Sequence, residues 1–220
     1  MADPHSASTV EHIASAITAA VRGGHLAPGQ RLTEAAFVRR YGVSRSTVRE
    51  AFQRLAADGL LALEPHRGVV VRQLSRKEVD NLFEVRGALE ALAVGLAAPG
   101  IRVAPQQLLA LQGEMDRAVE ANDISAFSDL NRRFHAMFPE AADNALLRES
   151  LLRLSNSIYW LQFRLLINRQ EVLQSNVQHR LVVEAIMAGD AQSAQAAMRN
   201  HIDASRRLVQ LLPDDHFASA

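Results

Sequence analysis

The sequence predicts a mainly α-helical protein in which a small β-hairpin is confined to residues 60 to 72. Apolar residues recur at helical spacing from residue 9 almost to the C-terminus, and no strand-like alternation follows Arg72. A capping-box sequence at residues 75 to 78 starts a new helix after a short linker. We therefore expect two domains, an N-terminal one over residues 8–73 and an all-helical one over residues 75–212.

The N-terminal domain is expected to contain three helices and a two-stranded hairpin. Gly42 can take the positive φ of a tight turn, and Ser44 then stands where the N-cap of the next helix belongs. Leu60–Leu63 and Val69–Arg72 have the composition of two strands, joined by a turn at residues 64–68. The expected helices are residues 9–22, a short segment before Gly42, and residues 45–58.

The helix after Gly42 has two faces of opposite character. One face is apolar and repeats at i, i+3, i+4 and i+7, through Val48, Ala51, Phe52 and Leu55. Arg45, Arg49 and Gln53 lie one turn apart on another face. Arginine can bond guanine bidentately in the major groove of DNA, so this layout is typical of a helix-turn-helix reading head with a wing. An ordinary amphipathic helix with a solvated basic face is the alternative for this segment taken alone.

Four blocks of the N-terminal domain resemble the winged-helix domain of the GntR family of bacterial transcriptional regulators. They are the PG-Q-RL-T-E motif of residues 28–34, YGVSRSTVREA of 41–51, DGLL of 58–61 and HRGVVV of 66–71. The resemblance implies a repressor that binds a palindromic operator in double-stranded DNA as a homodimer. The residues that it places on DNA are Arg45, Ser46, Thr47, Arg49, His66 and Gly68.

Charge and composition agree with such a role. The net charge of the chain is zero, but residues 1–74 hold nine arginines and six acidic residues, a local charge of +3. The chain lacks cysteine, which excludes disulfides and cysteine-ligated zinc. It shows no signal peptide and no run of apolar residues long enough for a membrane span. We expect a cytoplasmic protein without membrane contact, whose tail from Pro213 is loose.

The C-terminal domain is predicted to be a bundle of six or seven helices. The six segments recognised lie near residues 76–97, 105–121, 124–138, 144–167, 170–188 and 191–211, with breaks at Pro99-Gly100 and Pro139 among others. Polar residues interrupt the apolar stripes of three of these helices, at Asn131, His135, His179 and His201. Converging imidazoles suit Zn²⁺, Ni²⁺ or a similar divalent metal. The alternative is that each is a hydrogen-bonded core histidine.

Residues 75–212 resemble the FCD ligand-binding domain of the FadR subgroup of GntR regulators. The EVRGALE sequence around Arg86, the Asp143-Asn144 pair and the AGD sequence of residues 188–190 carry the resemblance, together with the Asn131 and histidine pattern. It implies a divalent metal held by Asn131, His135, His179 and His201, and a small organic acid as effector. The family usually has aspartate where this chain has Asn131, and an amide oxygen is the weaker ligand for a dication.

Arg86 is a second candidate for effector binding, because it lies on an apolar stripe where a charge is unexpected. A buried guanidinium needs an anion, which is either Glu90 four residues later or the carboxylate of a ligand. We do not expect an enzyme. A metal-dependent hydrolase or lyase and a direct metal sensor are the two alternatives for the histidine cluster, but no acidic residue shares an obvious face with it.

Overall fold

The computed structural model describes residues 4–64, 67–166 and 168–218. The chain folds into two compact units. One consists of residues 1–75 with residues 153–160 and 213–220, and the other of residues 76–152 with residues 161–212. The mainly helical class predicted from the sequence is confirmed, with strands confined to the N-terminal unit among the described residues.

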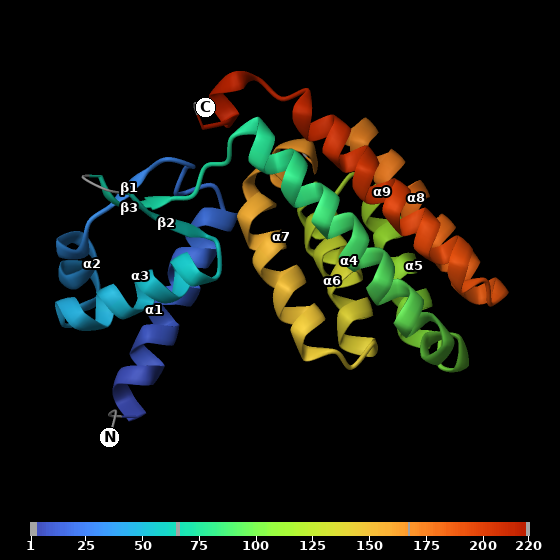
Figure 1. Cartoon of the computed structure of the whole chain (residues 1–220), viewed down its shortest axis with the longest axis horizontal. Helices are drawn as coiled ribbons and strands as arrows, with labels where there is room; N and C mark the ends of the chain where they lie inside the picture. Colours follow the sequence, from blue (N-terminus) through green and yellow to red (C-terminus); the bar gives the residue numbers. More distant parts are fainter. Residues whose placement is uncertain (1–3, 65–66, 167, 219–220) are drawn as a thin grey trace. The chain divides into compact units, whose positions relative to one another are not determined.

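The N-terminal unit combines a helix-turn-helix with a small antiparallel sheet (Figure 1). The helices are α1 (Pro4–Arg22), α2 (Glu34–Tyr41) and α3 (Arg45–Ala57), and the strands are β1 (Arg31–Leu32), β2 (Leu61–Glu64) and β3 (Gly68–Val71). The sheet order is β1-β3-β2. Strand β1, which the sequence reading missed, pairs Arg31 with Val70 and Leu32 with Val69. Two residues are too few for an alternating pattern, so only the tertiary pairing reveals this strand.

One apolar core holds this unit together. Phe52 and Val48 of α3 pack with Ile13 of α1 and Leu61 of β2, and all four side chains are almost fully buried. Phe37 of α2 meets Phe52 edge to face, with ring centroids 5.2 Å apart. Since the core takes the whole apolar stripe of α3, the opposite side of that helix is left to solvent.

The C-terminal unit is all helical. It contains α4 (Arg76–Val103), α5 (Gln106–Glu120), α6 (Ile124–Ala141), α8 (Arg169–Ala188) and α9 (Ala191–Gln210). It also contains both ends of α7 (Ala145–Leu166), whose residues 153–160 belong to the first unit. Helix α4 packs along α9 and also contacts α6, while α9 packs on α8 and α5 packs on both α6 and α8 (Figure 1). The core between them therefore collects side chains from α4, α6, α8 and α9, the four helices that carry the candidate site.

Two expected helix breaks and the expected loose tail are wrong. Helix α4 continues through Pro99 to Val103, and α6 continues through Pro139 to Ala141. Each proline stands in the last two turns of its helix, where only a few residues follow and the loss of one backbone hydrogen bond is tolerated. In the tail, Phe217 is buried and the Ala218 N–H donates to the Leu74 carbonyl, 2.9 Å away.

Membrane-span criteria of length and hydropathy are met by no single helix among the described residues. Helices α4 and α5 meet them only as a pair, and they are bent by 106° at the break between them.

Candidate DNA-binding surface and metal centre

The start of α3 is fixed by the two residues that the sequence singled out. Gly42 adopts φ 65°, and its N–H donates to the Val38 carbonyl, which closes α2 in the left-handed conformation. Ser44 then caps α3, because its hydroxyl accepts from the Thr47 N–H at 3.1 Å. The same hydroxyl lies 2.7 Å from Ser46 Oγ and 2.8 Å from Thr47 Oγ1. This network aligns the first turn of α3 and its hydroxyls.

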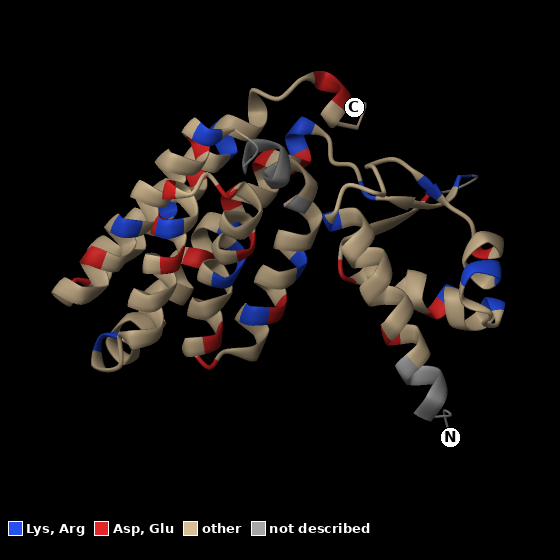
Figure 2. Ribbon diagram, turned by 180° about the vertical axis from the view of Figure 1, so that it is seen from behind, with Lys and Arg blue, Asp and Glu red and all other residues tan. Residues whose placement is uncertain are grey.

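The basic side of α3 faces solvent. The side chains of Arg45, Ser46 and Arg49 are exposed, and Thr47 is partly exposed, whereas the apolar stripe of the same helix is buried. Basic residues of this unit are also seen on α2 and on the strands (Figure 2). The guanidinium groups that the sequence assigned to DNA are therefore available at the surface rather than locked in the core.

Arg49 is held by an acidic partner on the preceding helix. Its Nε donates to Glu34 Oε1 at 2.9 Å and its Nη2 donates to Glu34 Oε2 at 3.2 Å, a two-point contact between α3 and α2. This hydrogen bonding lowers the pKa of Glu34 and raises the pKa of Arg49. Both groups are thus charged in the free protein, and a phosphate or base that binds Arg49 competes with Glu34.

The wing contributes one described candidate, Gly68. Its φ of 80° opens β3 after the turn, a conformation that favours glycine, and the position is exposed. His66, the other wing residue assigned to DNA, lies outside the described residues. Sequence reasoning missed Arg31, an exposed residue of β1 that lies beside Gly68. A Cβ atom added at Gly68 would be 3.9 Å from the Nε atom of Arg31. Only the unpredicted strand β1 places it there.

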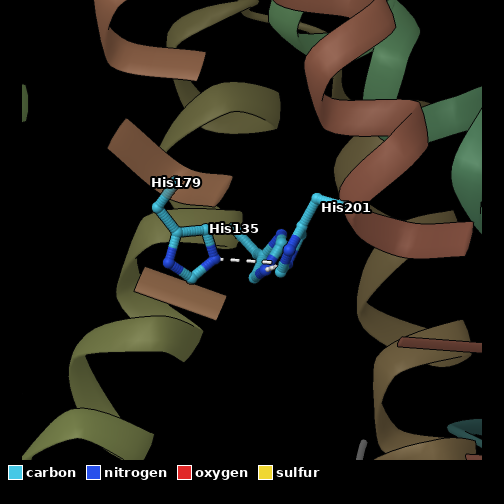
Figure 3. Close-up of side chains that lie close together, drawn as sticks. All are labelled: His135, His179 and His201. Atoms are coloured by element: carbon cyan, nitrogen blue, oxygen red, sulfur yellow. Dashed lines mark hydrogen bonds between the residues drawn. The ribbon is translucent and has the colours of Figure 1, made fainter. Parts of the chain in front are cut away.

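The three histidines of the C-terminal unit come together in its core (Figure 3). His135 is on α6, His179 on α8 and His201 on α9, and all three are buried. The Nε2 atom of His201 is 3.3 Å from Nε2 of His135 and 3.2 Å from Nε2 of His179. Nitrogens bound to one tetrahedral zinc ion at ordinary Zn–N distances are separated by about 3.3 Å. The two distances from His201 match that requirement, and the ligand atoms of all three histidines lie within 4.8 Å of one another.

Hydrogen bonds on the far side of two rings fix where their protons lie. Nδ1 of His135 is 2.7 Å from the Glu90 carboxylate, and Nδ1 of His201 is 2.9 Å from Gln178 Oε1. Both oxygens can only accept, so each Nδ1 carries a hydrogen and donates it. The Nε2 atoms are thereby directed at one another. Two unprotonated nitrogens this close repel each other unless a proton or a metal cation lies between them.

The electrostatics of the cluster favour neutral imidazoles at His179 and His201. Burial lowers the pKa of His179 and of His201 well below the ordinary value, and the neighbouring histidines add to the effect. Burial alone would raise the pKa of the Glu90 carboxyl, but the His135 imidazole and the Arg86 guanidinium outweigh it and hold this pKa at about 2. Glu90 is therefore an anion in the core, which supplies a negative charge beside the cluster.

Asn131 carries an unsatisfied oxygen. Its Oδ1 is buried and has no hydrogen-bond partner, and it precedes His135 by four residues, on the same side of α6. An orphaned acceptor in a core is costly, and a metal ion or a ligand donor would remove that cost. Nδ1 of His179 is buried and unpartnered as well. The three imidazoles form a donor set that fits a divalent cation.

Arg86 is paired with Glu90 and also keeps a donor that a ligand could use. Its Nε donates to Glu90 Oε1 at 2.8 Å and its Nη2 is 2.7 Å from the same oxygen, so the intrahelical ion pair exists. Its Nη1 is buried without a partner. The guanidinium is thus neutralised by Glu90 and still has a free donor. From the sequence, Glu90 was predicted only as the i, i+4 partner of Arg86. Its bond to His135, and the bond of Gln178 to His201, depend on the packing of helices that are distant in the sequence.

Over most of its length, the chain is similar to known bacterial transcriptional regulators. Residues 9–71 match the model of "Bacterial regulatory proteins, gntR family", and residues 81–204 match that of the FCD domain. A probable D-xylose utilization operon transcriptional repressor of Paenarthrobacter nicotinovorans is 32% identical over 82% of this chain and 80% of its own length. The HTH-type transcriptional repressor RspR of Escherichia coli is 29% identical over 80% of this chain and 78% of its own.

A solved structure shares the fold. A crystal structure of a GntR regulator from Rhodococcus sp. RHA1 superposes with a TM-score of 0.78 at 21% identity, covering 92% of this chain and 98% of its own. The chain belongs to the GntR family of bacterial regulatory proteins and carries an FCD domain. It is a DNA-binding transcriptional regulator and not an enzyme, which removes the hydrolase and lyase alternatives for the histidine cluster.

Proposed function

We propose that this regulator is a homodimeric cytoplasmic repressor, whose two reading heads bind the half-sites of a palindromic operator. Support comes from the capped helix α3, which exposes Arg45, Ser46 and Arg49 on one side and is anchored by Phe52 on the other. Thr47, Gly68 and His66 complete the proposed DNA contacts, by carry-over from the family pattern. A single head reaches few base pairs, so useful specificity needs two of them.

The second part of the proposal is a divalent metal, zinc or nickel, bound by Asn131, His135, His179 and His201. The observation that supports it best is the convergence of three buried Nε2 atoms, two of which belong to rings whose protons are fixed on Nδ1. Bound there, the metal would supply a Lewis-acidic centre for an oxygen of the effector. Glu90 and Gln178 would orient two of the ligand rings.

The third part is the effector, a small organic acid. Arg86 offers one buried, unpartnered N–H group, and it lies in the same hydrogen-bonded network as His135, through Glu90. We propose that an effector carboxylate accepts from Arg86 while another of its oxygens approaches the metal. Such a ligand changes operator binding only by the free energy with which it distinguishes two arrangements of the dimer.

Metal analysis and calorimetry test the second part. Protein stripped with a chelator is titrated with Zn²⁺ and Ni²⁺, and bound metal is counted by mass spectrometry in wild type and in His201→Ala. We expect one ion per chain in wild type and a large loss of affinity in the variant. His25→Ala, which removes an exposed histidine of the other unit, is the matched control. Equal metal content in wild type and His201→Ala would refute the site.

A thermal-shift screen tests the third part. Sugar acids, dicarboxylates, hydroxy acids and amino acids are added to metal-loaded and to stripped protein. We expect stabilisation by one class of acids that is lost in Arg86→Gln. Release of DNA by metal alone, with no acid of any class stabilising the protein, would instead identify a direct metal sensor.

A further inference from the structure

Arg31 is an exposed arginine on the outer side of the small sheet. The register of β1 and β3 places Arg31 opposite Val70 and Leu32 opposite Val69. Successive residues of a strand point to opposite faces of a sheet. Because Leu32 is buried in the apolar core of this unit, the side chain of Arg31 points away from that core. Its guanidinium is therefore available to a partner.

The guanidinium of Arg31 lies beside the first residue of β3. A Cβ atom added at Gly68 would be in van der Waals contact with it, 3.9 Å from Nε and 4.0 Å from Nη2. Gly68 is exposed and is one of the positions proposed to touch DNA. A DNA strand that reaches Gly68 from this side of the sheet therefore meets the guanidinium of Arg31 as well.

Arg31 also has no acidic partner among the described residues. Arg49 is bonded to Glu34, and Arg67 is bonded to Glu64 at 2.9 Å, which also neutralises the glutamate that is paired with Gly68 in the sheet. Arg31 makes no ion pair and no side-chain hydrogen bond within the described ranges. It can bind an anion without first giving up another contact, and its fork of N–H groups matches the oxygens of a phosphate.

The position of Arg31 favours the DNA backbone over the bases. The hairpin end of the sheet and the start of α3 lie toward the same end of this unit, so one duplex can meet both (Figure 1). The tip of a wing is the part that enters a groove. A guanidinium beside the first residue of β3 is set back from that tip, where it meets the phosphates that border the groove.

We propose that Arg31 binds a phosphate of the DNA backbone and anchors each reading head to the duplex independently of base sequence. This inference rests on the proposed function and adds a contact that the family pattern did not supply. Arg45 and Arg49 of α3 would then discriminate bases, while Arg31 of β1 holds the head in place.

The expected signature of a phosphate contact is its dependence on salt. Each phosphate that a protein neutralises contributes about −0.9 to the slope of log K against log salt concentration. A dimer has two heads, so loss of Arg31 should reduce the magnitude of this slope by about 1.8. Between about 50 and about 200 mM salt, the affinity lost through the substitution should therefore shrink by roughly twelvefold.

Anisotropy titrations of the full-length protein with a labelled random-sequence duplex, at several salt concentrations, measure this slope. The variant Arg31→Gln removes the charge and keeps much of the side-chain stem beside Val70. We expect it to bind more weakly at low salt, with the smaller slope and an unchanged melting temperature. Arg31→Lys keeps the charge and should keep the wild-type slope. Should Arg31→Gln fail to fold, Arg31→Thr, which suits a strand, takes its place.

Arg54→Gln is the matched control. It removes the same charge from an exposed residue of the same unit, which is paired with Glu11 and lies about 180° around α3 from Arg45. We expect its slope to stay within about 0.5 of the wild-type value. An equal loss of slope in Arg54→Gln and Arg31→Gln would show a general effect of charge and overturn the proposal.

The remaining outcomes separate this inference from the proposed function. A wild type that prefers the site enriched from a random library, with Arg31→Gln equal to it in affinity and slope, refutes the Arg31 contact alone. An Arg31→Gln protein that loses this preference at an unchanged slope identifies a base contact and also refutes the phosphate assignment. A wild-type protein that binds no duplex at low salt refutes both proposals.

Discussion

Replacement of Arg86 by methionine is expected to destabilise the C-terminal unit strongly. The substitution keeps the volume and removes the guanidinium, which leaves the Glu90 carboxylate in the core with His135 as its remaining partner. Removal of one partner from a buried ion pair costs about 3 to 5 kcal/mol. Burial opposes the charged form of Glu90, and His135 and Arg86 together hold the pKa of this carboxyl at about 2, so loss of the guanidinium removes part of what keeps the carboxylate charged.

Thermal and urea unfolding of chelator-treated protein at pH 7 measures this cost. We expect the Arg86→Met transition to be lower by roughly 10 °C or more. The double variant Arg86→Met, Glu90→Gln removes both charges and keeps an oxygen for the His135 N–H, so it should recover most of the loss. An Arg86→Met protein within about 1 kcal/mol of wild type, or a double variant less stable than Arg86→Met, would refute the reasoning.

Three further outcomes are expected. Asp116→Asn should destabilise the protein by on the order of 2 kcal/mol, because Asn176, Gln112 and Arg180 all donate to this carboxylate. These bonds lower its pKa despite the opposing effect of burial, so the stabilisation is present above the ordinary value of 3.8 and is lost as the pH falls below it. The penalty of the variant in urea unfolding should therefore be constant from pH 5 to 8, and a penalty that persists at pH 2 would contradict this assignment. Asn131→Asp should raise zinc affinity by on the order of tenfold in chelator competition, whereas an unchanged affinity would exclude this residue as a ligand. Glu34→Gln should strengthen binding to random duplex DNA at low salt, since it removes an anion that competes for Arg49, and the gain should shrink as salt is added.

The helices were predictable from the sequence because their apolar spacing is regular and most of their ends carry a local signal. Gly42 and Ser44 act through their own backbone and side chain, so the start of α3 could be read without the fold. The helix ends predicted at Pro99 and Pro139 were wrong. A proline indicates a break from the local sequence alone, whereas the packing of the surrounding bundle decides whether the helix ends there. Strand β1 has no local signal at all.

The candidate metal centre was predictable only in part. His135, His179 and His201 interrupt apolar stripes, which indicates that they point inward, and their convergence depended on the family resemblance. Their partners could not be found, because Gln178 looks like an ordinary polar residue next to His179 in the sequence. Its bond to His201 joins α8 to α9, and only packing creates it.

Selection of DNA from a random duplex library tests the central claim most directly, with wild type and Arg49→Ala compared by anisotropy on the enriched site. We expect wild type to enrich a palindromic sequence. The Arg49→Ala protein should lose the preference for this site over random DNA while its dimer mass and melting temperature stay unchanged, because Arg49 is exposed and outside the core. Undiminished preference for the enriched site in Arg49→Ala would contradict the assignment of α3 as the reading helix.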